Sequence, residues 1–147
     1  MAPLLWVAIG LATWEGFWWN ARRVRRAETY AKARVYARQL GRPLVVIGAP
    51  DAGFTSGYGC GDVTIDMAGS SCPRTAKLDI TKPLPFRDNS ACCIIMCTLE
   101  YVNQLEPALS EIARISGGHA FFVGVEPWTL AAYFYPGARR TLPARYR

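Results

Sequence analysis

Apolar residues change their spacing along the chain, and the changes divide it into three parts. Residues 3–19 (PLLWVAIGLATWEGFWW) are almost continuously apolar, with Glu15 as the single charged side chain. Residues 20–40 lack Gly and Pro, are rich in Ala and Arg, and predict a continued helix that Gly41 and Pro43 end. From Pro43 onward, short apolar runs alternate with polar and Gly-rich stretches, as is typical of an α/β domain.

This division predicts three segments. Residues 1–20 form a transmembrane or membrane-embedded helix, residues 21–42 a basic juxtamembrane helix, and residues 43–147 an α/β domain. The expected apolar face of the second segment consists of Val24, Ala27, Ala31, Val35 and Arg38.

Five apolar runs in the third segment predict an open, mostly parallel sheet. The expected strands are residues 44–47, 63–67, 78–80, 91–97 and 119–125. A helix after the fourth strand has Asn103 as its expected N-cap and Gly117 as its stop. A last helix is expected over residues 128–135. Ligands of such sheets bind beyond the carboxyl ends of the strands, so a crevice is expected there.

The first segment has features of a membrane anchor. A spanning helix needs about 20 mostly apolar residues, and about 17 at the short end. Trp14, Trp18 and Trp19 are placed as in an interfacial aromatic belt, and four arginines follow within residues 22–26. The positive-inside rule then predicts a single pass with the N-terminus outside and the domain in the cytoplasm. Glu15 leaves open a helix that lies in the interface or packs against a partner, because a carboxylate at membrane depth is costly unless paired.

A cleaved signal peptide fits the N-terminus less well. No basic residue precedes the apolar run, and no small-x-small cleavage site follows it.

The net charge of +6 belongs to one stretch. Residues 20–42 hold eight basic side chains and one acidic side chain, whereas residues 43–147 hold nine of each. A nucleic-acid-binding face on the domain is therefore not expected. The basic helix is expected to be solvated or to contact anionic lipid headgroups, each Lys or Arg contributing about 1 kcal/mol there.

The five cysteines are odd in number and include no CxxC pair. This pattern predicts reduced cysteines in an intracellular domain and not a disulfide framework. No metal site is expected either, because Cys60 and Cys72 lack evident partner ligands at the usual spacing. His119, the single histidine, is expected at the start of a strand.

The run DITKPLPFRDNSACCIIMCTLEYV, with the helix and the RISGG turn after it, resembles class I S-adenosylmethionine-dependent methyltransferases of type 11. The resemblance covers about residues 44–126 and is more specific in its second half. The matching residues are Asp79, Leu84, Pro85, Phe86, Asp88, Asn89, Ser90, Leu99, Glu100, Val102, Arg114, Gly117 and Gly118.

The resemblance implies a set of cofactor contacts. It places the methionine part of S-adenosylmethionine over Gly48 and Gly53, the ribose at Asp66, and the adenine near Asp79 and Ile80. Each of these residues also has a structural interpretation, because aspartates cap loops and glycines serve turns. No catalytic residue stands out.

The chain also departs from the family pattern. Its loop reads GAPDAG, the helix between the first two strands is short or missing, and no sixth and seventh strands are expected. Thr98 and Tyr101 stand where the family often has histidines. These departures favour a membrane-anchored, degenerate methyltransferase-like protein, a non-catalytic accessory or assembly subunit of a membrane complex. Its expected partners are membrane lipid and other subunits. The alternative is an active S-adenosylmethionine-dependent methyltransferase that acts on a membrane-associated small molecule.

Overall fold

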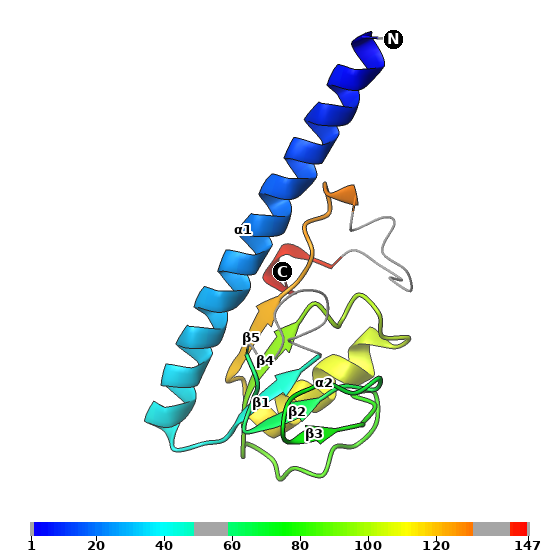
Figure 1. The fold of residues 1–147 in the computed structure, drawn as a ribbon. Coiled ribbons are helices and arrows are strands. Elements are labelled where there is room, and N and C mark those ends of the chain that lie inside the picture. Colours follow the sequence, from blue (N-terminus) through cyan, green and yellow to red (C-terminus); the bar gives the residue numbers. More distant parts are fainter. Residues whose placement is uncertain (1, 49–58, 131–141, 147) are drawn as a thin grey trace.

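The computed structural model describes residues 2–48, 59–130 and 142–146, which form an α/β fold around an all-parallel sheet (Figure 1). Its elements are α1 (Ala2–Leu40), β1 (Leu44–Ile47), β2 (Val63–Ile65), β3 (Thr75–Ala76), β4 (Cys92–Met96), α2 (Leu105–Ser116), β5 (Ala120–Val123) and the 3-10 helix η1 (Ala144–Tyr146). The strand order is β3-β2-β1-β4-β5. Because β1 pairs with both β2 and β4, the boundary between β1 and β4 is the switch point of the sheet. The predicted parallel α/β fold behind an N-terminal helix is confirmed.

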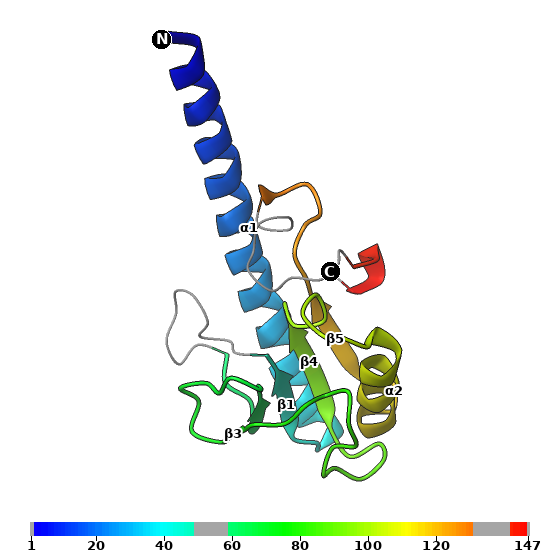
Figure 2. The same ribbon diagram turned by 90° about the vertical axis from the view of Figure 1, so that its right-hand side faces the viewer.

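Helices cover both faces of the sheet. α1 packs on one face and α2 on the other, so the central strands are buried on both sides (Figure 2). In β1, Leu44 and Val46 pack with α1, whereas Val45 and Ile47 belong to the core under α2. All four side chains are fully buried, which explains why this strand is a continuous apolar run.

The C-terminal half of α1 is a layer of the domain. Ala33 and Ala37 are 0% and 1% exposed and lie against residues of β1 and β4. Gly41 has φ +64°, and the residue after it donates its N–H to the Ala37 carbonyl, which ends the helix where the sequence predicts. The predicted apolar face is wrong, since Val24 and Val35 are 45% and 54% exposed. The sheet contacts Ala33 and Ala37 instead, which are not part of that face.

Basic residues of α1 hold the helix against the domain. Arg34 donates to Asp62 Oδ1 at 2.8 Å and to the Cys60 carbonyl at 2.6 Å. Further along the helix, Arg25 lies 2.5 Å from Glu126 Oε1. Part of the basic stretch that sequence analysis placed in solvent or at lipid headgroups therefore makes tertiary contacts.

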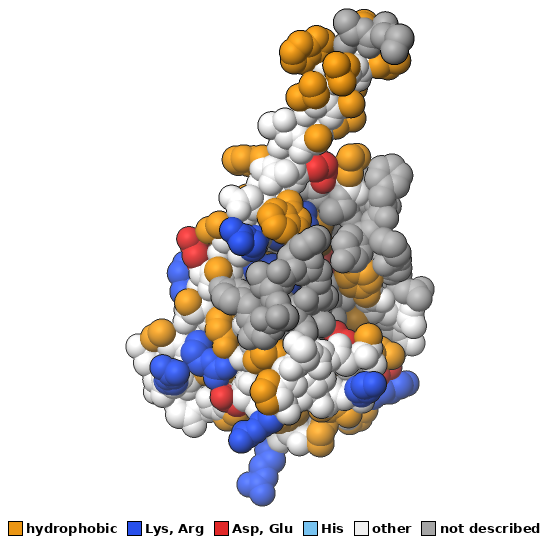
Figure 3. All heavy atoms as spheres, viewed as in Figure 1, with side chains coloured by type: hydrophobic (Ala, Val, Ile, Leu, Met, Phe, Trp, Pro, Cys, Tyr) orange, Lys and Arg blue, Asp and Glu red, His pale blue; other side chains and the backbone are white. Residues whose placement is uncertain are grey.

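The N-terminal half of α1 extends beyond the sheet (Figures 1 and 2). Leu4, Leu5, Trp6 and Val7 are 60–77% exposed, and Figure 3 shows apolar side chains gathered around this end. The helical conformation predicted for residues 1–20 is confirmed from residue 2, and its location in a membrane stays a prediction. In the described part of the chain, no helix has the combined length and apolar character required to cross a membrane.

Residues that carry the sequence resemblance fix the segment that leads into β4. Arg114 of α2 donates to the carbonyls of Leu84 and Phe86, at 3.1 and 2.9 Å, and to Asp88 Oδ1 at 2.6 Å. Glu111 accepts from Arg114 and from the Leu84 N–H. The hydrogen bond from Arg114 is the main cause of the lowered pKa of Glu111. These motif residues have a structural role.

The third strand differs from its prediction. β3 is Thr75–Ala76, and Ala76 pairs with Ile65, the last residue of β2. Leu78 and Ile80 lie beyond the paired segment and pack into the core under α2. Their alternation with polar neighbours reflects this burial and not membership of the sheet.

Two helix predictions also need comment. α2 begins at Leu105 after the N-cap Gln104, which makes no side-chain cap hydrogen bond, so the Asn103 prediction is wrong by one residue. Gly117 ends α2 with φ +61°, as predicted. The helix expected over residues 128–135 falls largely within residues 131–141, outside the described residues.

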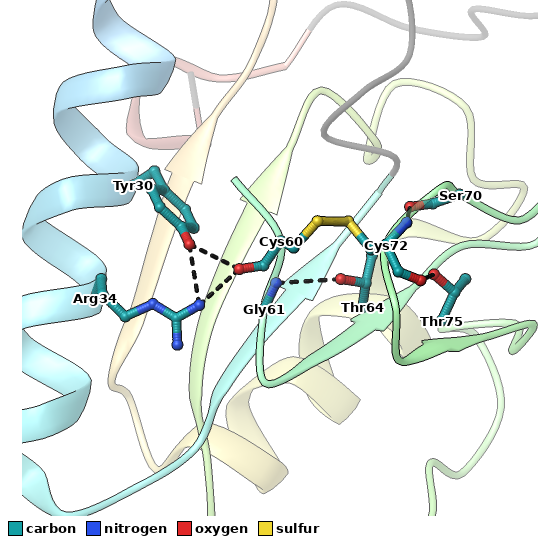
Figure 4. The surroundings of a disulfide bond; sticks show 8 residues. All are labelled: Tyr30, Arg34, Cys60, Gly61, Thr64, Ser70, Cys72 and Thr75. Carbon is teal, nitrogen blue, oxygen red and sulfur yellow. Dashed lines mark hydrogen bonds between the residues drawn. A yellow bond between two sulfur atoms is a disulfide. The ribbon is translucent and has the colours of Figure 1, made fainter. Parts of the chain in front are cut away.

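The cysteine prediction is wrong for one pair. Cys60 and Cys72 form a disulfide (Figure 4). The buried cysteines of β4, Cys92 and Cys93, are free thiols. The bridge joins the segment before β2 to the connection between β2 and β3. Tyr30 and Arg34 of α1 both donate to the Cys60 carbonyl, at 2.7 and 2.6 Å. The pairing of β2 with β3 brings the two cysteines together, and no local sequence motif predicts the bridge.

Loss of this disulfide should lower the free energy of unfolding by about 3 kcal/mol, the value expected for a bridge that closes a short loop. Urea denaturation of Cys60→Ser/Cys72→Ser should show this decrease, and the wild type in dithiothreitol should match the variant. The variant itself should not respond to dithiothreitol. Equal stability of the oxidised and reduced wild type would contradict a stabilising bridge.

Candidate functional site

A cavity of about 480 Å³ lies at the carboxyl ends of β1, β2 and β4, beside the switch point of the sheet. Small-molecule sites typically enclose about 300–1,000 Å³. The cavity is lined by Arg22, Arg26, Ile47, Ile65, Asp66, Met67, Ala68, Leu78, Asp79, Ile80, Thr81, Met96, Cys97, Thr98, Tyr101, Val102, Asn103 and Val125.

Three of the predicted cofactor-binding residues meet at this cavity. Asp66 follows β2, Asp79 and Ile80 belong to the segment after β3, and all three line the cavity. Gly48 follows β1 but is not part of the lining that the described residues form. Gly53 lies outside the described residues.

Gly48 is required by close packing between the ends of β1 and β4. It has φ +99°, and a Cβ there would lie 2.7 Å from the Met96 carbonyl and would overlap the Thr98 hydroxyl. Its N–H donates to the Ile65 carbonyl at 2.8 Å. A larger residue would therefore displace Thr98, which lines the cavity.

Both aspartates stabilise their own loops through one oxygen. Asp66 Oδ1 accepts the N–H groups of Ala68 and Gly69, at 2.8 and 3.0 Å. Asp79 Oδ1 accepts the N–H and the hydroxyl of Thr81, at 2.9 and 2.7 Å. The loop-capping interpretation of both residues is therefore confirmed. These bonds do not use Oδ2, so capping is compatible with contact between either carboxylate and a ligand.

The Thr81 N–H and hydroxyl keep Asp79 charged. Together they lower the pKa of Asp79, and the nearby Lys82 acts in the same direction. The end of the cavity near β3 is therefore anionic at neutral pH.

The opposite end of the cavity carries groups that sequence analysis missed. Arg22 and Arg26 of α1 line it, although the sequence predicted that the basic helix is solvated or contacts lipid headgroups. Their spacing gives no signal of this role, which depends on α1 crossing the face of β1, β4 and β5. Cys97 follows β4 with φ +48°, and burial raises the pKa of its thiol to about 11. The thiol is therefore protonated at neutral pH and is not poised as a nucleophile.

Comparison of the chain with protein-family models, curated proteins and solved structures found no match. The choice of a ligand therefore depends on the geometry of this cavity and on the motif resemblance.

Replacing Thr81 by Val should raise the pKa of Asp79 toward its ordinary value, because the hydroxyl donor is lost while the N–H remains. NMR titration of the Asp79 carboxyl measures the change, and Thr81→Ser, which keeps a hydroxyl, is the matched control.

Acid stability should change in a defined direction. Because the folded-state pKa of Asp79 is lowered, its contribution to stability is present above the unfolded-state pKa and declines as the pH falls through the folded-state pKa. Thr81→Val should therefore lose less stability on acidification than the wild type. An unchanged Asp79 titration in this variant would contradict the assigned cause.

Proposed function

We propose that the domain binds S-adenosylmethionine in the cavity at the switch point, as a methyltransferase-like domain that α1 holds at a membrane. The proposal is carried by one observation: Asp66, Asp79 and Ile80 converge on a single cavity beyond the ends of β2 and β3. Open parallel sheets of this strand order bind nucleotide-like ligands at this place.

The lining near β2 and β3 suits an adenosine. A carboxylate at the end of the second strand can accept both ribose hydroxyls, and Oδ2 of Asp66 is not used in the loop bonds. Leu78 and Ile80 provide apolar contact for a flat base on the same side of the cavity. The Asp79 carboxylate beside them can accept a hydrogen bond from an amino group of the base.

Transfer of the methyl group requires mainly an in-line approach between an acceptor atom and the sulfonium methyl, and positioning supplies much of the rate. A general base among the lining residues is therefore not essential. The proposed acceptor is a small molecule associated with the membrane.

The exposed end of α1 supports association with a membrane. A helix that is apolar on all sides is normally buried in a protein core or in lipid. Here Leu4, Leu5 and Trp6 are exposed, and Trp14 and Phe17 are 47% and 63% exposed nearer the domain. Aromatic side chains favour the boundary between lipid and water.

The position of Glu15 suits the same arrangement. Its carboxylate accepts the Leu130 N–H at 2.7 Å, so Glu15 has a partner in the domain. Glu15 therefore lies where α1 meets the domain, and residues 3–14 of the same helix carry no charged side chain.

A second candidate function is that of a non-catalytic accessory or assembly subunit of a membrane complex. The same exposed apolar residues favour it, because large apolar patches mark interaction sites. The Cys60–Cys72 disulfide favours the accessory function over an active enzyme in the cytoplasm. Disulfides persist in oxidising compartments, whereas an active enzyme with its domain in the cytoplasm would use the cytoplasmic pool of S-adenosylmethionine. An accessory subunit is compatible with either side of the membrane.

Isothermal titration of S-adenosylmethionine and S-adenosylhomocysteine into the full chain tests the proposed function. The full chain is needed because α1 covers one face of the sheet. The wild type should bind both compounds, and Asp66→Asn should weaken binding roughly ten- to a hundredfold by removing a charge-assisted acceptor. Asparagine keeps the Oδ1 acceptor of the loop bonds, so the fold is preserved.

Asp88→Asn is the matched control, because its side chain is 72% exposed and lies outside the cavity lining. It should bind as the wild type does. If the folded wild type binds neither compound, the cofactor proposal fails and the accessory function is favoured.

Flotation with anionic lipid vesicles tests the membrane proposal. Replacing Leu5 and Trp6 by Glu should abolish flotation, because each change places a charge in the end of α1 proposed to enter lipid. Val35→Glu changes another exposed apolar residue of α1, next to the domain, and should float as the wild type does. Equal flotation of all three proteins would overturn lipid insertion through this end.

A further inference from the structure

The segment that follows β5 runs along α1 toward the apolar end of that helix (Figures 1 and 2). Its contacts with α1 step along both segments in turn. The Gly124 carbonyl accepts a hydrogen bond from Arg25 at 3.1 Å, and further along the rings of Trp128 and Trp18 lie 5.3 Å apart. Residues 124–130, here called the strut, therefore carry the chain from the sheet to the aromatic part of α1.

Backbone groups hold the far end of the strut against α1. Trp14 Nε1 donates to the Trp128 carbonyl at 3.4 Å, and the Leu130 N–H donates to the Glu15 carboxylate at 2.7 Å. The side chains of Trp128 and Leu130 take no part in these bonds and are 51% and 42% exposed. The strut therefore presents two apolar side chains to solvent at a fixed place beside α1.

These side chains extend an aromatic cluster that is built around the half-buried Trp18. Its ring meets those of Trp14, Phe17 and Trp128 edge-on, with centroids 5.6, 5.2 and 5.3 Å away. The three surrounding rings are 47%, 63% and 51% exposed, respectively. We call the exposed surface of Trp14, Phe17, Trp128 and Leu130 the aromatic platform. Contiguous apolar surface that stays exposed marks an interaction site.

The apolar end of α1 indicates what kind of partner this surface fits. Residues 4–7 are consecutive, apolar and 60–77% exposed. Because a helix has about 3.6 residues per turn, these four side chains point to all sides of α1. A single protein partner covers one side of a helix, whereas lipid surrounds it, and a helix that is apolar all round suits lipid.

The polarity of α1 changes at the platform. Residues 3–14 include no charged side chain, whereas four arginines lie within residues 22–26. Tryptophan gathers at the boundary between lipid and water because its ring is apolar and its N–H is polar. The platform lies between the apolar and the charged part of α1, which is the place of such a boundary.

We propose that the aromatic platform seats the domain on the surface of a lipid bilayer, with Trp128 and Leu130 of the strut entering the lipid boundary beside Trp14 and Phe17. This inference rests on the membrane association in the proposed function, and it adds a second contact that the domain itself makes. A domain attached through one helix can rotate about that helix, whereas two contacts fix the face that it turns to the lipid.

This seating brings the cavity close to the bilayer. Arg22 lines the cavity and lies about 6 Å along the helix axis from Trp18, at about 1.5 Å per residue. Val125, which also lines the cavity, belongs to the strut. The cavity wall therefore begins about one helical turn from the platform. The arrangement suits an acceptor whose apolar part stays in the lipid.

Hydroxyl-radical footprinting of the full chain reads individual side chains with and without vesicles of phosphatidylcholine and phosphatidylglycerol. Vesicles should protect Trp128 and Leu130 of the platform from oxidation, together with Trp6 at the apolar end of α1. Tyr36 is the internal control, because it lies about 27 Å along α1 from Trp18 and should be oxidised equally in both samples.

Partitioning into the same vesicles provides an independent measurement. Trp128→Ser should weaken partitioning about tenfold and Leu130→Ser about threefold, because an apolar side chain no longer leaves water. Both changes keep the backbone bonds of the strut, and Leu130→Ser also keeps the ring contacts of Trp18. Val35→Ser is the matched control, since Val35 is 54% exposed on α1 beside the domain, and it should partition as the wild type does.

The outcomes separate the platform from the membrane anchor of the proposed function. Protection of Trp6 without protection of Trp128 would overturn the inference and leave the anchor intact, whereas protection of Trp128 alone would support the platform without insertion of α1. Protection of neither would overturn both. The inference also fails if Trp128→Ser and Leu130→Ser both partition as Val35→Ser does. Titration with S-adenosylmethionine tests the cofactor separately.

Discussion

The close packing of α1 on the sheet is the contact on which the other features depend. Ala33 and Ala37 are buried against β1 and β4, and a larger side chain at either position would push the helix away from the sheet. This packing covers one apolar face of the sheet, so α1 and the strands form one folding unit. It also brings the arginines of α1 to Asp62 and Glu126, and it carries Arg22 to the cavity wall. The same straight helix then extends its apolar end away from the domain.

The predictable parts of the fold are those in which burial leaves a strong local signal. β1 and β4 lie in the middle of the sheet with a helix on each face, so every position must be apolar and the strands are evident in the sequence. The ends of the helices are evident for a different reason. Gly41 and Gly117 adopt positive φ, which glycine reaches at the lowest cost.

The remaining features depend on contacts between distant segments. Alanine at positions 33 and 37 does not stand out from its neighbours, so the face of α1 that meets the sheet had no marker in the sequence. β3 is only two residues long and is defined by its pairing with β2. The Cys60–Cys72 bridge depends on that same pairing. Asp66 and Asp79 were identified from the family resemblance, because nothing in local periodicity distinguishes an aspartate that caps a loop from one that also faces a cavity.

The motif that suggests a methyltransferase is mostly a packing motif in this chain. Arg114 fixes the Leu84–Asp88 segment, and Gly117 lies where a Cβ would overlap the Asn89 side chain. Any domain that joins a loop, a buried strand and a covering helix in this way could keep these residues for stability alone. The motif therefore argues for the arrangement of the fold more strongly than for a cofactor. A ligand is suggested instead by the cavity, whose lining includes Asp66 and Asp79 beyond β2 and β3 as well as Arg22 and Arg26 of α1. A cavity lined by both carboxylates and guanidinium groups is suited to a ligand that carries polar groups of both kinds.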